Sequence, residues 1–181
     1  VNDIPTISPI TKTGNEDETI TFTLANFTDV FVDVDGTLGK IKIVSLPTNG
    51  TLKLNGTNIT LNQEISSATI GQITFVPNLN WSGATSFLWN GSDGTAYALA
   101  DATVGITINA VNDLPTVSNF SLNATEDTPL SFTVANFTSS YTDVENTLAK
   151  IKLATLPTNG QLKLSGTTLT ADAEIAVDDL A

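Results

Sequence analysis

The sequence repeats itself at a constant offset of 110 residues, from Val1 to Val111, with no insertion or deletion. The segment Val1–Pro5 (VNDIP) returns as Val111–Pro115 (VNDLP), and Leu46–Gly50 (LPTNG) returns unchanged as Leu156–Gly160. About half of the paired positions are identical. A solenoid turn has a period of about 20–50 residues, so a period this long corresponds to a whole domain. The chain is therefore a tandem array of domains.

The repeat predicts one complete domain at residues 1–110 and a second copy at residues 111–181. The second copy ends at the counterpart of Gly71, so it lacks counterparts of the last predicted strands. Losing those strands would expose part of a core and leave unpaired strand edges. Three explanations stay open: a truncated sequence, an artificial fragment, or strands supplied by a neighbouring chain.

The composition narrows the classes of function and partner. Nineteen acidic residues against seven lysines give a net charge of −12, which argues against nucleic acid and anionic membranes and favours cations. Histidine and cysteine are absent, so the commonest general base and thiol chemistry are both missing. We expect no enzymatic activity. The sequence contains no run of about 20 apolar residues, the length needed to span a membrane. We expect the chain to be an internal segment of a longer secreted polypeptide.

Alternation of apolar and polar residues is the dominant pattern, as in half-buried strands. Turn-forming residues such as Asn55-Gly56 separate the alternating segments. A helical turn fits only at 65–70, where Ser67-Ala68 interrupts the alternation. The pattern predicts an all-β fold of tandem immunoglobulin-type Greek-key β-sandwiches. The predicted strands of the first copy lie at residues 19–24, 40–44, 51–54, 72–76, 85–89 and 103–108.

An ordered set of short motifs resembles the tandem repeats of large bacterial surface proteins, known as tandem-95, VCBS-like or cadherin-like repeats. The set comprises a VNDxP linker, an acidic pair before a strand, an acidic loop, an LPxxGxLxL segment, an FxP segment and a DG turn. In this chain these are Val1–Pro5, Glu16-Asp17, Asp33–Gly36, Leu46–Leu54, Phe75–Pro77 and Asp93-Gly94. The resemblance implies a cadherin-like sandwich from a stalk or extender segment of an adhesin, at the bacterial cell surface, whose partners are the adjacent repeats. It also implies Ca²⁺ at the junctions.

The acidic motifs are the predicted calcium ligands, because Ca²⁺ takes six to eight oxygen ligands from carboxylates, carbonyls and water. Sandwich topology places the loop after the second strand beside the linker and the last hairpin, and the Glu-Asp turn at the opposite end. A junction would then gather acids from two successive repeats. The predicted ligands are Asn2, Asp3, Glu16, Asp17, Asp33, Asp35 and Asp93 in the first copy, and Asn112, Asp113, Glu126, Asp127, Asp143 and Glu145 in the second. The alternative is that these residues are ordinary turn formers.

Two further functions stay open. Trp81, Trp89 and Tyr97 could stack on sugar rings, which would make the chain a polysaccharide- or cell-surface-binding module. However, Trp89 shares a strand face with Phe87 and Trp81 lies in an Asn-x-x-Gly turn, so core packing is the favoured interpretation of both. Lateral or strand-exchange self-association, in which a filament subunit is completed by a neighbour's strands, is the other alternative.

Overall fold

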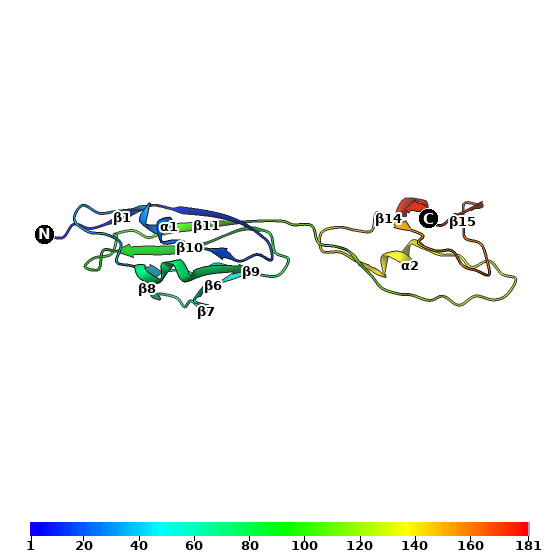
Figure 1. Ribbon diagram of the computed structural model, residues 1–181, viewed down its shortest axis with the longest axis horizontal. Coiled ribbons are helices and arrows are strands. Elements are labelled where there is room, and N and C mark those ends of the chain that lie inside the picture. Colours follow the sequence, from blue (N-terminus) through cyan, green and yellow to red (C-terminus); the bar gives the residue numbers. More distant parts are fainter. Residues whose placement is uncertain (181) are drawn as a thin grey trace. The chain divides into compact units, whose positions relative to one another are not determined.

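The computed structural model describes residues 1–180 and divides the chain into two compact units, Val1–Val111 and a second beginning at Asn112 (Figure 1). Both units consist of strands with only short helices. The all-β class predicted from the alternation is therefore correct.

The first unit is a sandwich of two sheets, a five-stranded sheet in the order β2-β11-β10-β5-β8 and a four-stranded sheet in the order β3-β9-β6-β7. All neighbours in these sheets are antiparallel except β2 and β11, which run parallel. A separate pair, β1 and β4, lies at the start of the unit. The strands are β1 (Thr6–Ile7), β2 (Ile10–Asn15), β3 (Ile20–Thr21), β4 (Phe31–Val32), β5 (Lys40–Ile43), β6 (Gly50–Leu54), β7 (Thr57–Asn58), β8 (Glu64–Ser66), β9 (Ile73–Pro77), β10 (Gly83–Ser92) and β11 (Ala102–Asn109).

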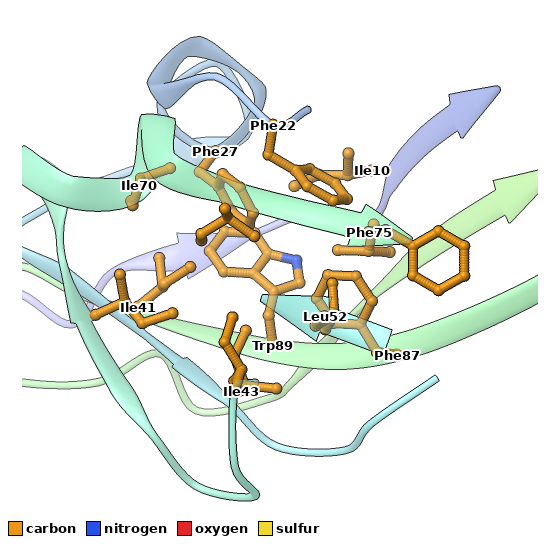
Figure 2. Close-up of a cluster of buried hydrophobic side chains, with 14 of the residues drawn as sticks. Ile10, Phe22, Phe27, Ile41, Ile43, Leu52, Ile70, Phe75, Phe87 and Trp89 are labelled. Carbon is orange, nitrogen blue, oxygen red and sulfur yellow. The ribbon is translucent and has the colours of Figure 1, made fainter. Parts of the chain in front are cut away.

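The core follows the alternation of the sequence. In β11 every second side chain is buried, and in β5 the buried Ile41 and Ile43 alternate with the more exposed Lys40 and Lys42. Trp89 of β10 lies at the centre with no exposed surface, and Phe27 meets its indole edge-on at 5.0 Å between ring centroids (Figure 2). Phe22 packs against Phe87 in the same edge-on manner at 5.9 Å. Aromatic pairs favour this geometry because the positive ring edge meets the negative ring face.

Two short helical segments interrupt the strands. The helical turn predicted at 65–70 is present as the 3₁₀ segment η1 (Ser67–Gln72). The strand predicted at 19–24 is shorter than predicted, because β3 ends at Thr21 and α1 (Leu24–Thr28) begins at the last predicted residue. The Thr23 N–H donates to Asn26 Oδ1 at 3.0 Å, a local bond that alternation does not reveal. Over residues 1–180, no helix is both long and apolar enough to cross a membrane.

The second unit reproduces only part of this architecture. Its sheets are the two-stranded pairs β12-β13, β14-β17 and β15-β16. Among its described residues there are no counterparts of β2 and β3. Its elements are β12 (Thr116–Val117), α2 (Val134–Thr138), β13 (Tyr141–Thr142), β14 (Lys150–Lys152), β15 (Lys163–Leu164), β16 (Thr167–Thr168), β17 (Glu174–Ala176) and η2 (Val177–Leu180).

Candidate functional site

The acidic loop of the first unit is joined to the amino-terminal segment. Pairing of β1 with β4 carries this segment past the loop that follows β4. The Asp3 N–H donates to both carboxylate oxygens of Asp35, at 3.2 and 3.3 Å, and the Asp35 N–H donates to Asp33 Oδ1 at 3.3 Å. The structure therefore brings together three of the sequence-predicted ligands from positions about thirty residues apart.

Asp93 reaches the same loop from the hairpin between β10 and β11. Its Oδ1 atom accepts the backbone N–H groups of Thr95 at 2.6 Å and Ala96 at 2.7 Å. These bonds hold the pKa of Asp93 below its ordinary value, with smaller contributions from the side chains of Asn2 and Asp33. Asp93 is therefore ionised at neutral pH, next to Asp33 and Asn2.

We call Asn2, Asp3, Asp33, Asp35 and Asp93 the acidic loop cluster. Two of its carboxylate oxygens, Asp33 Oδ2 and Asp93 Oδ2, are buried and have no hydrogen-bond donor from the protein. Gly36 lies between the two acids. A Cβ atom at Gly36 would lie 2.8 Å from Asp33 Oδ2 and 2.9 Å from the Asp93 Cβ, so only glycine allows both side chains this position. Buried polar atoms without partners are rare because desolvation is then uncompensated. The geometry leaves both oxygens available to a ligand from outside the protein, either a water molecule that donates hydrogen bonds or a cation.

The donor set is suited to a hard cation bound by mixed oxygen ligands. Within residues 1–180, no three Asp, Glu, His or Cys side chains are grouped as in a ready-made metal site. Ca²⁺ does not require such a group, since amide oxygens, backbone carbonyls and water complete its coordination. The Asn2 side chain lies beside Asp93 and carries an amide oxygen, which is a ligand atom of this type.

The Glu-Asp turn at the opposite end of the first unit is engaged by the protein itself. Glu16 is buried, and its Oε1 atom accepts the Val111 N–H at 2.6 Å. The Glu16 N–H donates to the Asn109 carbonyl oxygen at 3.0 Å. Asp17 has a positive φ of 59° and accepts the Asn80 N–H at 2.9 Å. These two predicted ligands thus hold the outgoing linker and a neighbouring turn through direct hydrogen bonds.

In the second unit the equivalent acidic loop is closed by more hydrogen bonds. The Asp113 N–H donates to Glu145 Oε2 at 3.0 Å, as Asp3 does to Asp35 in the first unit. Asp143 Oδ1 accepts the N–H groups of Glu145 at 3.0 Å and Asn146 at 2.7 Å. Asp143 Oδ2 accepts the Tyr141 hydroxyl at 2.9 Å. Loss of hydration opposes ionisation of Asp143, but the bonds from Asn146 and Tyr141 outweigh it and lower the pKa of Asp143.

The remaining predicted ligands occupy simpler surroundings. The Asn112 Oδ1 atom accepts the Asn146 side-chain amide at 3.3 Å, which ties the second linker to its loop. Glu126 and Asp127 lie in an exposed turn, where the Thr128 hydroxyl donates to the Glu126 carbonyl oxygen. The predicted gathering of Glu16 and Asp17 with acids of the second unit involves both units and stays a prediction.

The aromatic residues considered for sugar stacking do not form a shared platform. Trp89 is completely buried and Trp81 packs against the core, which agrees with the favoured interpretation of both. Tyr97 is half-buried, and Lys40 and Lys42 lie over its ring at 5.3 and 4.7 Å from the centroid.

The sequence did not predict the ion pair between Lys40 and Glu64, which lies next to Tyr97. Lys40 Nζ lies 2.7 Å from Glu64 Oε2, and the Tyr97 hydroxyl donates to Glu64 Oε1 at 2.6 Å. The hydrogen bond from Lys40, followed by that from Tyr97, lowers the pKa of Glu64. The repeat itself carried a signal for this pair, because Lys150 and Glu174 form the same bridge at 2.6 Å one repeat later.

Comparison with known protein families assigns the first unit to a family of β-sandwich domains. A profile of the cadherin-like domain matches residues 1–109, and the chain belongs to the cadherin-like domain family. No curated protein matches the sequence significantly. Among solved structures, an endo-fucoidan hydrolase of glycoside hydrolase family 107 is similar over 59% of this chain, at 18% identity and a TM-score of 0.35. The match covers 14% of the hydrolase chain.

Proposed function

We propose that this chain is a non-catalytic spacer segment of an extracellular, adhesion-type protein, and that Ca²⁺ stiffens it through the acidic loop cluster of Asn2, Asp3, Asp33, Asp35 and Asp93. The observation that carries the proposal is the pair of buried, donorless oxygens on Asp33 and Asp93. Cadherin-like domains generally bind Ca²⁺ and are typically extracellular, which supports the same assignment.

A divalent cation would act here by neutralising charge and joining separate segments. Two carboxylates held close together repel one another when both carry a charge. An ion held by Asp33 and Asp93 would remove that repulsion, and Asn2 would add an amide oxygen. Because Asn2 and Asp3 belong to the segment that enters the sandwich, an ion in the loop cluster would fix that segment to the body of the domain.

The proposed setting follows from the tandem organisation. The linker motif VNDxP and the acidic loop occur in both copies, so each copy is expected to meet its neighbour through the same kind of segment. The partners are then the adjacent repeats of one long polypeptide, with the bacterial cell surface as the location. The direct bond from Val111 N–H to buried Glu16 supports a defined exit direction for the linker.

The test is thermal unfolding of the 1–181 chain in EDTA and across a Ca²⁺ titration. A ligand that binds only the native state raises stability by about 2.7 kcal/mol when its free concentration is one hundred times Kd. The rise should be lost in the double variant Asp33→Asn/Asp93→Asn. It should persist in Glu18→Gln, which removes one carboxylate from an exposed position in the opposite turn.

The outcomes separate the competing functions. A Ca²⁺-dependent rise that needs Asp33 and Asp93 supports the rigid spacer. No rise at millimolar Ca²⁺ would sink the metal proposal, and the loops would then be ordinary turns in a flexible tether. In that case glycan binding becomes the first alternative, to be tested with Tyr97→Ala on a panel of anionic and neutral polysaccharides.

A further inference from the structure

The two acidic loops differ at the residue of β4 or β13 that stands two positions before the loop aspartate. In the first unit this residue is Phe31, which lines an open pocket together with Asp33 and has no hydrogen-bond donor on its ring. In the second unit it is Tyr141, whose hydroxyl donates to Asp143 Oδ2 at 2.9 Å. The corresponding oxygen of the first unit, Asp33 Oδ2, is buried and has no donor from the protein.

A second difference points in the same direction. Gly36 leaves the space into which Asp33 and Asp93 both project. Its counterpart is Asn146, whose backbone N–H donates to Asp143 Oδ1 and whose side chain donates to Asn112 Oδ1. Asp143 therefore accepts three hydrogen bonds from its own unit, from Glu145, Asn146 and Tyr141.

We propose that this hydroxyl contributes to the order in which the two loops take up Ca²⁺, with Phe31 leaving the first loop open to the ion and Tyr141 acting as a resident substitute for it in the second. Within residues 1–180 the second loop also has no counterpart of Asp93. The inference rests on the proposed function, because it assumes that the loop cluster binds Ca²⁺. A metal ion entering the second loop must first displace the Tyr141 hydroxyl from Asp143. The first loop has no such bond to break.

The physical consequence is a pair of opposite effects. A hydroxyl that bonds to the aspartate stabilises the loop without metal, because it satisfies a buried oxygen. The same bond competes with the metal, so it weakens Ca²⁺ binding. A substitution that acted only through packing would not move these two quantities in opposite directions.

The experiment uses the 1–181 chain and its Phe31→Tyr and Tyr141→Phe variants, each of which differs from the parent by one hydroxyl. The mass of 19.0 kDa suits amide NMR, which follows residues 33–36 and 143–146 separately during titration with CaCl₂ alone. An open pocket of about 290 Å³, lined by Phe31, Asp33 and Gly36 among others, provides room for the added hydroxyl.

We expect the 33–36 amides of the parent chain to shift at a Ca²⁺ concentration at least ten times lower than the 143–146 amides. Phe31→Tyr should weaken binding at the first loop about tenfold, equivalent to about 1.4 kcal/mol, and should raise the unfolding temperature in EDTA. Tyr141→Phe should do the reverse at the second loop and narrow the difference between the loops.

The possible failures are distinct. If the parent chain binds no Ca²⁺ at either loop, the proposed function fails and the inference falls with it. If the parent chain binds but Phe31→Tyr leaves the affinity unchanged, the inference is wrong and the proposed function stands. If Phe31→Tyr does not fold, Tyr141→Phe decides, and an unchanged affinity at residues 143–146 overturns the inference.

Discussion

Corresponding segments of the two repeats adopt different structures. Residues 10–15 form β2 in the first unit, whereas the corresponding residues 120–125 form no strand. The same holds for β3 and residues 130–131. In the first unit β2 pairs with β11 and β3 pairs with β9, and the described part of the second unit contains no counterparts of β9 and β11. A strand is thus created by its partner as much as by its own sequence.

The exposure of side chains changes in parallel. Phe22 is completely buried, but its counterpart Phe132 is 41% exposed. Ile10 is 6% exposed, and its counterpart Phe120 is 41% exposed. By contrast, α2 keeps the local bond of α1, with the Thr133 N–H donating to Asn136 Oδ1 at 2.8 Å. Local hydrogen bonds therefore survive without the missing strands, whereas burial does not.

The largest effect is expected from supplying the second unit with strands of the first. A chimera of residues 111–180 followed by residues 71–110 should form a complete sandwich and unfold cooperatively, with a free energy of unfolding in the usual range of about 5–15 kcal/mol. Residues 111–180 alone should lack such a transition. The measurement is urea unfolding followed by circular dichroism. A control with Asp in place of the appended Phe87 and Trp89 should not fold, and cooperative unfolding of residues 111–180 alone would refute the comparison.

A matched pair of core truncations gives the next largest effect. Phe27→Ala should lower the free energy of unfolding of the first unit by about 3–5 kcal/mol, since a fully buried ring leaves a cavity. Phe137→Ala should cost less than half as much, because that ring is only partly buried. Urea unfolding followed by tryptophan emission measures the loss for Phe27→Ala, because Trp81 and Trp89 both lie in the first unit. The amide NMR signals of residues 134–138, followed over the same urea range, measure it for Phe137→Ala. Equal losses of unfolding free energy for the two variants would contradict the conclusion that Phe137 is less buried than Phe27.

The two Glu-Asp turns should differ more modestly. Glu16→Ala removes a buried acceptor from the Val111 N–H and should destabilise the first unit by about 1–3 kcal/mol. Glu126→Ala, at an exposed position, should stay within about 0.5 kcal/mol of the parent. Urea unfolding in EDTA excludes any contribution of metal. Glu16→Gln keeps an acceptor oxygen and should restore part of the loss; a loss as large as that of Glu16→Ala would mean that charge rather than the hydrogen bond matters.

The smallest effect concerns the ion pairs shared by both repeats. The hydrogen bonds from Lys40 and Tyr97 hold the pKa of Glu64 below its ordinary value near 4.5, whereas Lys150 alone provides the hydrogen bond to Glu174. The stability that Glu64 contributes is therefore complete above about pH 4.5 and is lost as the pH falls through the lower folded-state pKa. Glu64→Gln should lower the unfolding temperature slightly at pH 7, and more than Glu174→Gln does. The difference between Glu64→Gln and the parent should shrink progressively as the pH falls below about 4.5.

The sequence predicted most of the first sandwich. Alternation located the strands around Ile41, Leu52, Phe75, Trp89 and Val104, because inward side chains of a half-buried strand must be apolar. It failed at Leu24, the last residue of a predicted strand, because the bond between Thr23 and Asn26 and the burial of Phe27 favour the helix α1 there. Topological reasoning also placed Asp3, Asp33, Asp35 and Asp93 at one end of the domain.

The finer features of the candidate site could not be predicted from the sequence. The donorless oxygens of Asp33 and Asp93 depend on how closely two distant loops approach, which Gly36 permits. The exchange of Phe31 for Tyr141 is visible in the sequence, but its meaning requires knowing that the hydroxyl reaches Asp143. The direct bond of Glu16 to Val111 likewise depends on the pairing of β2 with β11, which brings the turn after β2 beside the outgoing linker.

The sequence by itself determined the 110-residue repeat, the all-β class and the turns, because periodicity and local turn chemistry are written into neighbouring residues. The tertiary structure alone decided which alternating segments became strands, which aromatic rings were buried and which carboxylates were left without a donor. Those outcomes depend on hydrogen bonds and contacts between residues far apart in the chain. The two copies share about half of their residues. They differ in strand formation and burial because the first copy contains the partner strands β9 and β11, and the described part of the second does not.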